Sequence, residues 1–122
     1  MQVAHIVVID DSPTEIYVLQ TMLERNGHNV SVAKDAEEGI ALVKRSQPDA
    51  VLMDVVMPGM NGFQATRELN KNPETAHIPI IIVTTKDQQT DKIWGMRQGA
   101  KDYLVKPVKE SDLMGILGTV LG

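Results

Sequence analysis

Short apolar runs alternate along the chain with longer segments in which apolar residues recur at helical spacing. Most of the runs are continuous stretches of Val, Ile and Leu, which is typical of parallel strands covered by helices on both faces. The pattern therefore predicts five strands, at residues 6–9, 30–33, 50–53, 80–83 and 103–105.

The segments that follow the strands are predicted to be helices. The first is the most clearly marked, because Ser12 and Glu15 match a capping box, Pro13 suits a first turn and Gly27 can close the far end. The fourth helix is polar almost all round, so we expect it to be loosely held or to have a partner. Trp94 is predicted to be a packing residue, whereas an exposed Trp94 would indicate a docking surface. The other helices are expected near residues 36–45, 63–71 and 113–121, and the fourth near 88–98.

Five strands and five helices in strict alternation predict an α/β fold with right-handed crossovers. The expected architecture is a (βα)5 doubly wound, five-stranded parallel sheet of the flavodoxin-like type, with strand order 2-1-3-4-5. In such sheets ligands bind beyond the carboxyl ends of the strands. The residues that directly follow the strands are therefore the candidates for function.

Composition narrows the class of protein. The 122 residues, 43% of them apolar and 23% charged, match one globular domain over residues 1–122. The absence of cysteine excludes disulfides, thiolate metal sites and a cysteine nucleophile. A net charge of −4 argues against nucleic acid as a partner. Because the chain lacks a signal-peptide pattern and any apolar run of membrane-spanning length, we expect a cytoplasmic protein without membrane contact.

Three aspartates follow two strands that would be neighbours in this strand order. Asp10 and Asp11 end the first strand, and Asp54 ends the third. Crowded carboxylates either take up protons or bind a cation, and hard oxygen ligands suit Mg²⁺. Turn or cap chemistry is the alternative for Asp10 and Asp11, and these two residues alone leave both interpretations open.

Two further side chains would share this edge of the sheet. Thr84 ends the fourth strand and Lys106 ends the fifth. Three carboxylates, a hydroxyl and an ammonium group can bind a metal ion together with a phosphoryl group, because their charges offset one another. No glycine-rich phosphate loop follows the first strand, and His5, His28 and His77 fall toward the opposite edge, where we expect surface residues.

These residues together resemble a known family. The IDD after the first strand, LMDVVMPGMNG around the third, VTT after the fourth and YLVKP at the fifth are similar to motifs of CheY-like receiver domains of bacterial two-component response regulators. The resemblance covers essentially the whole chain. The ordered set of motifs at successive strand ends is highly specific.

The resemblance implies a chemical role for the residues at the strand ends. Asp54 would accept a phosphoryl group from the phosphohistidine of a histidine kinase, and Lys106 and Thr84 would contact the phosphoryl oxygens. Thr84 would then move inward and vacate space for Tyr103, which would repack the surface formed by the fourth helix, the fifth strand and the fifth helix. The alternative is a half-buried Tyr103 with its hydroxyl in water. The Lys106–Pro107 peptide bond would be cis.

The resemblance also implies a metal site. Asp11 would bind Mg²⁺, or Mn²⁺ in its place, directly, and Asp10 would act mainly through water. Asp54 and the backbone carbonyl of Val56 would supply the remaining protein ligands. A main-chain oxygen suffices at Val56, so the apolar side chain is compatible with this role.

Within the family, the segments DSPTE, NGFQATR and TTKDQQTDKIWGMRQGAKDYLVKPV are most similar to PilH-type single-domain regulators of type IV pilus chemosensory systems, which control twitching motility. This resemblance implies a CheA-type histidine kinase, or its phosphotransfer domain, as the phosphodonor. No output domain is expected after Gly122. A monomeric regulator of this kind would signal by contact with a protein that the sequence does not identify.

Three alternative functions stay open. The domain could be a phosphate sink without a target of its own. It could be a receiver-like interaction module that never takes phosphate, although the intact set of strand-end residues argues against this. It could also be an Mg²⁺-dependent phosphatase of the haloacid dehalogenase type, but that family needs D-x-D after its nucleophilic strand, whereas Asp54 is followed by Val-Val-Met. We therefore expect a phosphoacceptor signalling protein and not an enzyme acting on external substrates.

Overall fold

The computed structural model describes residues 3–122. Strands and helices alternate strictly over this range, as the sequence predicts, and each predicted strand agrees with the observed one to within one residue at either end. In chain order the elements are β1 (His5–Ile9), α1 (Pro13–Arg25), β2 (Asn29–Ala33), α2 (Ala36–Ser46), β3 (Ala50–Met53), α3 (Gly62–Lys71), β4 (Ile80–Thr84), α4 (Gln89–Arg97), β5 (Asp102–Val105) and α5 (Glu110–Leu121).

The five strands form one parallel sheet in the order β2-β1-β3-β4-β5, which confirms the flavodoxin-like architecture. Ile9 at the end of β1 pairs with Met53 at the end of β3, and Met53 pairs in turn with Ile82 of β4. Because β1 and β3 end at the same level, the residues that follow them leave the sheet side by side.

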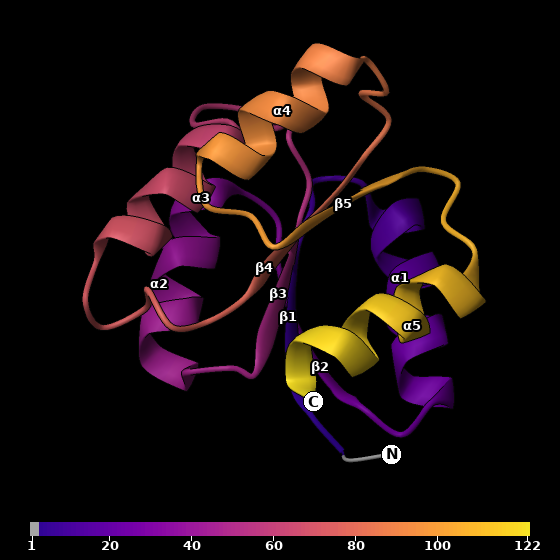
Figure 1. The fold of residues 1–122 in the computed structure, drawn as a ribbon. Helices are drawn as coiled ribbons and strands as arrows, with labels where there is room; N and C mark the ends of the chain where they lie inside the picture. Colours follow the sequence, from indigo (N-terminus) through magenta and orange to yellow (C-terminus); the bar gives the residue numbers. More distant parts are fainter. Residues whose placement is uncertain (1–2) are drawn as a thin grey trace.

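Helices cover both faces of the sheet, with α1 and α5 on one side and α2, α3 and α4 on the other (Figure 1). Successive side chains of a strand point to opposite faces. Ile6 and Val8 accordingly pack with residues of α1 and α5, whereas Val7 and Ile9 pack with residues of α2 and α3. Both faces of β1 are therefore apolar, which accounts for the continuous apolar run in its sequence.

The helix α4 differs from the others because only one of its residues, Gly95, is buried. A Cβ at Gly95 would lie 2.8 Å from the Cδ1 atom of Ile82 and 3.1 Å from the ring of Tyr103, so α4 approaches the sheet closely through this glycine. Trp94 is 49% exposed, and the prediction that it is a packing residue is wrong. Gly95, the next residue along the helix, takes the position that faces the sheet, and the indole of Trp94 therefore lies on the outer side.

The histidines were expected on the surface, and for His28 this prediction is wrong. His28 is only 3% exposed, and its Nδ1 atom accepts a hydrogen bond of 3.2 Å from the backbone N–H of Ala4. The residue lies just before β2, where pairing with β1 draws it under the start of the chain's first strand. His5 is half-buried and its Nε2 atom lies 2.8 Å from Ser31 Oγ, whereas His77 is exposed.

Within residues 3–122, none of the helices combines the length and the apolar character needed to cross a membrane.

Candidate functional site

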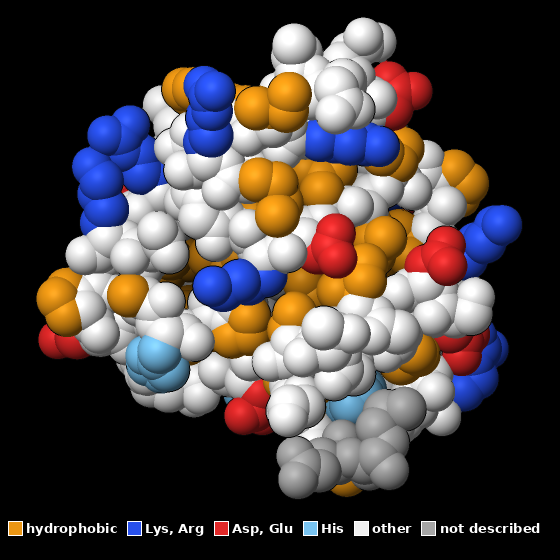
Figure 2. Space-filling view, viewed as in Figure 1, with side chains coloured by type: hydrophobic (Ala, Val, Ile, Leu, Met, Phe, Trp, Pro, Cys, Tyr) orange, Lys and Arg blue, Asp and Glu red, His pale blue; other side chains and the backbone are white. Residues whose placement is uncertain are grey.

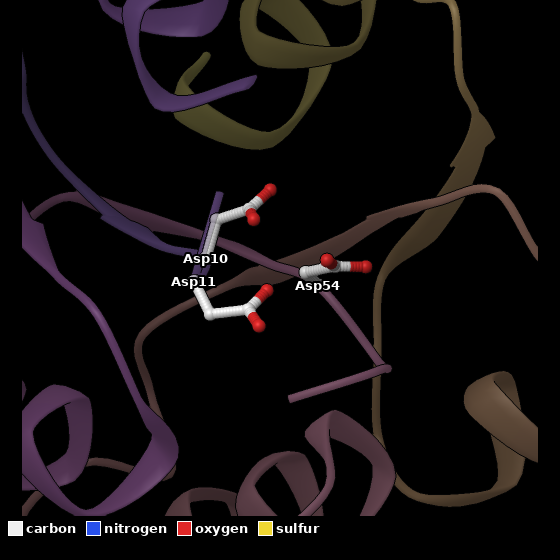
Figure 3. A group of neighbouring side chains, drawn as sticks. All are labelled: Asp10, Asp11 and Asp54. Carbon is white, nitrogen blue, oxygen red and sulfur yellow. The ribbon is translucent and has the colours of Figure 1, made fainter. Parts of the chain in front are cut away.

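Three carboxylates meet where β1 and β3 end. Asp10 and Asp11 follow β1, Asp54 follows β3, and one carboxylate oxygen from each residue lies within 4.8 Å of the others. Figure 3 shows the carboxylates of Asp10 and Asp11 directed toward the same space beside Asp54. The convergence predicted from the strand order is therefore present.

The position of Asp54 is fixed through its backbone. Its N–H donates a 2.9 Å hydrogen bond to the carbonyl of Ile9, and its Oδ1 atom accepts a 2.8 Å bond from the N–H of Val55. Gly62, the first residue of α3, packs directly against it, because a Cβ at Gly62 would lie only 1.9 Å from the Asp54 carbonyl oxygen. Only glycine permits α3 to begin this close to β3.

Asp10 and Asp11 have different surroundings. Asp10 is 1% exposed; its Oδ1 atom accepts a 2.9 Å bond from the N–H of Ser12, and its Oδ2 atom accepts a 2.7 Å bond from Lys106 Nζ. Asp11 is exposed, and its carboxylate makes no hydrogen bond or ion pair with any other residue in the range 3–122. A cation at this site would find the oxygens of Asp11 more available than those of Asp10.

Lys106 brings a positive charge to the carboxylates. Its Nζ atom lies 2.7 Å from Asp10 Oδ2, 3.5 Å from Asp54 Oδ2 and 3.7 Å from Glu15 Oε2, and its side chain is only 7% exposed. The backbone N–H of Lys106 donates to the carbonyl of Thr84, and the Lys106–Pro107 bond is cis, in agreement with the expectation. Burial lowers the pKa of Lys106, but the hydrogen bond to Asp10 and the surrounding carboxylates outweigh it and raise this pKa above its ordinary value.

Glu15 was missed as a member of this site because the sequence assigned it to a capping box. Ser12 does accept a 3.3 Å hydrogen bond from the N–H of Glu15, so the first half of the box is present. The Glu15 carboxylate, however, lies near Lys106. Its position one turn into α1, directly after the Asp-Asp pair, was the only signal in the sequence.

The carboxyl group of Asp54 holds its proton more tightly than an ordinary aspartate. Burial and the neighbouring charge of Asp10 raise its pKa, whereas Lys106, the Val55 N–H and the Thr84 hydroxyl lower it. The net shift is upward. Negative charge at this position is therefore under-compensated, and a cation between the three carboxylates would offset it.

Thr84 and Tyr103 both contact Lys86. Thr84 is fully buried, and its Oγ1 atom accepts a long hydrogen bond of 3.4 Å from the Lys86 N–H. The Tyr103 hydroxyl donates a 2.8 Å hydrogen bond to the Lys86 carbonyl at the protein surface, and its part in a switch stays a prediction. Burial, followed by the charges of Asp91, Asp54 and Asp87, raises the pKa of Tyr103 to about 12.

The donor set suits a hard divalent cation together with a phosphoryl group. The carboxylates are oxygen ligands, which Mg²⁺ and Mn²⁺ prefer, and the chain contains no cysteine to attract softer metals. Lys106 supplies an ammonium group beside Asp10 and Asp54. Val56 lies in the loop after β3 with its side chain 58% exposed, and its role as a backbone ligand stays a prediction.

The comparison with known protein families decides the classification. Residues 6–117 match the response regulator receiver domain. The chain belongs to this family. The resemblance seen in the motifs at the strand ends is thereby confirmed.

Individual relatives agree with this classification. The chain is 59% identical over 118 residues to the protein PilH of Pseudomonas aeruginosa. This match covers 97% of the present chain and 98% of PilH. The chemotaxis protein CheY4 of Vibrio cholerae matches 98% of this chain and 100% of its own with a TM-score of 0.90 and 29% identity. The receiver domain of the sensor histidine kinase PA1611 from Pseudomonas aeruginosa, solved with a magnesium ion in its active site cleft, matches 99% of both chains with a TM-score of 0.91 and 31% identity.

Proposed function

We propose that this receiver domain accepts a phosphoryl group on Asp54 from a phosphohistidine of a histidine kinase. The observation that carries the proposal is the meeting of Asp10, Asp11 and Asp54 with Lys106 and Thr84 at one edge of the sheet. In the transfer, the bond between phosphorus and the histidine nitrogen breaks and its electron pair stays on the imidazole. A new bond forms between phosphorus and a carboxylate oxygen of Asp54.

The residues around Asp54 have distinct tasks in this proposal. Lys106 neutralises charge on the phosphoryl oxygens, and its buried ion pair with Asp10 holds the ammonium group in position. The Thr84 hydroxyl donates to one of these oxygens. Such a transfer needs little covalent chemistry from the protein, because alignment and charge neutralisation lower most of the barrier.

A divalent cation belongs to the proposal as well. Asp11 and Asp54 would hold Mg²⁺ directly together with the Val56 carbonyl, and Asp10 would act mainly through water, which fits the engagement of both Asp10 oxygens by Ser12 and Lys106. When bound, the cation offsets the negative charge of the carboxylates and of the phosphoryl group. The magnesium ion reported for the PA1611 receiver domain supports this part.

The signal would leave the site through Thr84 and Tyr103. Phosphorylation adds a charge of roughly −1.5 to −2 and strong acceptor oxygens, which attract the Thr84 hydroxyl. Movement of Thr84 would disturb the hydrogen bond that its Oγ1 atom accepts from the Lys86 N–H. The carbonyl of Lys86 in turn accepts the hydrogen bond of the Tyr103 hydroxyl. We propose that this chain of contacts changes the surface formed by α4, β5 and α5.

The similarity to PilH suggests the pathway. We propose a regulator of a chemosensory system that controls type IV pili, located in the cytoplasm, with a CheA-type kinase or its phosphotransfer domain as the phosphodonor. The near-complete coverage of both proteins supports a PilH-like single-domain regulator. A role as phosphate sink is the alternative to signalling by a protein target.

Intact-protein mass spectrometry tests the central claim. Acetyl phosphate with Mg²⁺ is expected to add one phosphoryl group to the wild-type protein and none to Asp54→Asn. Asp112→Asn, an exposed aspartate of α5, serves as the matched control and is expected to label normally. Stoichiometric labelling of Asp54→Asn, or catalytic turnover of external phosphoesters, would overturn the proposal.

A further inference from the structure

A groove between α3 and α4 lies outside the phosphoacceptor site. It has a volume of about 330 Å³. Phe63 and Gln98, each 8% exposed, form its buried part, while the half-exposed Trp94 stands at its rim. We call this site the α3–α4 groove and define it by Asn61, Phe63, Gln64, Arg67, Trp94 and Gln98.

The large apolar side chains of α4 lie on its solvent-exposed side and not on the side that covers the sheet. Ile93, Trp94 and Met96 are 45%, 49% and 46% exposed, whereas the inward position is occupied by Gly95. A helix of a monomeric protein usually buries its large apolar residues and exposes its polar ones. Half-exposed aromatic and aliphatic residues beside a groove are typical of a protein interface.

Positive charge surrounds these apolar residues. The helices α3 and α4 carry four basic residues and two acidic ones, although the whole chain has a net charge of −4. In Figure 2, Lys and Arg side chains lie among apolar ones on the upper part of the molecule, over α3 and α4. Within residues 3–122, Arg67, Lys92 and Arg97 form no ion pair, while the acidic Asp91 lies 3.9 Å from Lys86.

From these observations we propose that the α3–α4 groove docks a segment of a partner protein that inserts one large apolar side chain beside Trp94 and places a carboxylate at Arg67. The groove has room for about one such side chain. Arg67 supplies the complementary charge, since a guanidinium group binds a carboxylate through two parallel hydrogen bonds. This inference does not depend on phosphorylation of Asp54.

A second copy of the chain fits the groove poorly. A two-fold symmetric contact places the same patch of each copy against the other. The basic residues Arg67 and Arg97 of both copies would then lie in one interface, and this concentration of like charge opposes association. An acidic segment of a different protein meets neither difficulty.

The groove is also connected to the phosphoacceptor site. Phe63 packs with Val55, the residue after Asp54, and with Tyr103 in one apolar cluster. Asn61 caps α3 through a 2.9 Å hydrogen bond from the N–H of Gln64, and α3 begins against the carbonyl of Asp54. A structural change at Asp54 would therefore affect Phe63 and the first turn of α3, both of which contribute to the groove.

Peptide display on the full chain tests the docking site. A library of twelve-residue peptides is selected on the unphosphorylated wild-type protein, and enriched peptides are synthesised with a fluorescent label for anisotropy measurements. We expect enrichment of peptides that carry a large apolar residue within one helical turn of Asp or Glu. Because Trp94 is the only tryptophan, its emission should shift on binding and report occupation of the groove directly.

Matched variants decide whether the groove binds the peptide. Trp94→Ala and Arg67→Glu are expected to weaken binding roughly tenfold or more. Thr90→Ala on the same helix and Lys71→Glu on α3, both exposed and outside the groove, should change the affinity less than about twofold. The proposal fails if selection enriches no peptide, if the enriched peptides are basic, or if the groove variants and the controls bind alike. It also fails if a single-stranded oligonucleotide or self-association causes the Trp94 shift.

Discussion

Asp54, the proposed phosphoacceptor, lies in a setting that disfavours its own negative charge. Burial and the charge of Asp10 raise its pKa, and the nearest cation, Lys106, is shared with Asp10. The ionised carboxylate therefore lowers the stability of the metal-free fold at neutral pH. A cation beside these carboxylates would offset the unfavourable charge, in agreement with the proposed metal site.

The raised pKa of Asp54 predicts how the stability of the fold depends on pH. The protonated carboxyl group stabilises the folded state below the ordinary aspartate pKa, about 3.9, and this stabilisation is lost as the pH rises through the raised value. Asp54→Asn, which never ionises, is therefore expected to unfold at a higher temperature than the wild type at pH 7 in EDTA. This advantage should shrink as the pH is lowered toward about 4. A difference that does not depend on pH would contradict the assignment.

Lys106 should be the most costly charged residue to remove. Lys106→Met leaves Asp10 and Asp54 buried without their cation, and loss of one partner of a buried ion pair costs roughly 3 kcal/mol. Urea denaturation in EDTA at pH 7 measures this loss. Lys101→Met, an exposed lysine just before β5, is the control and should change the free energy of unfolding by less than about 0.5 kcal/mol. Equal effects of the two substitutions would show that the buried ion pair adds no stability.

At the scale of elements, glycines decide how closely helices approach the strands. Gly62 lets α3 start against the carbonyl of Asp54, whereas a Cβ at Gly115 of α5 would meet no atom within 4 Å. The first glycine is required by packing, and the second only weakens its helix.

These two glycines provide a matched pair of substitutions. Gly62→Ala is expected to lower the free energy of unfolding by more than about 3 kcal/mol, because the new methyl group overlaps the backbone of Asp54. Gly115→Ala should raise it by about 0.5–1 kcal/mol through higher helix propensity. Chemical denaturation of both variants measures the two effects. A mild effect of Gly62→Ala would mean that α3 can withdraw from β3 without loss.

The elements themselves were largely predictable from the sequence, because most strands are continuous apolar runs and most helices repeat apolar residues at helical spacing. The orientation of α4 was not predictable. Its apolar residues follow no single face, and the inward position of Gly95 depends on the close approach of Ile82 and Tyr103, which no local pattern records. The burial of His28 likewise follows from the pairing of β2 with β1 and not from its neighbours in the sequence.

At the scale of the whole molecule, the site exists because the strand order places β1 beside β3. The convergence of Asp10, Asp11 and Asp54 could be predicted once this order was assumed. Contacts made by the backbone were beyond prediction, since the hydrogen bond from Val55 to Asp54 depends on the exact path of the loop. The contact between the Glu15 carboxylate and Lys106 could not be predicted either, because it depends on how α1 and the loop after β5 come together in space.

Binding of a divalent cation should stabilise the whole fold. A ligand that binds only the folded state adds about 2.7 kcal/mol when its concentration is 100 times its dissociation constant. Thermal unfolding of the wild type in EDTA and in increasing Mg²⁺ is expected to reveal a rising midpoint temperature. Asp11→Asn should lose most of this rise, while Glu24→Gln, an exposed acid of α1, should retain it. A rise that is equal in all three proteins would place the cation elsewhere.

The anchoring of Asp54 has a consequence for how the molecule responds. Its main chain is tied to Ile9, its side chain to Val55, and Gly62 closes against its carbonyl. In the proposed transfer, Asp54 is therefore held in place by the fold, and the phosphodonor has to align with it. The helix α4 is held differently, since Gly95 is its only buried residue. We therefore expect the movement of the proposed switch to occur in α4. In the proposed mechanism, phosphotransfer and movement therefore belong to different elements of the domain.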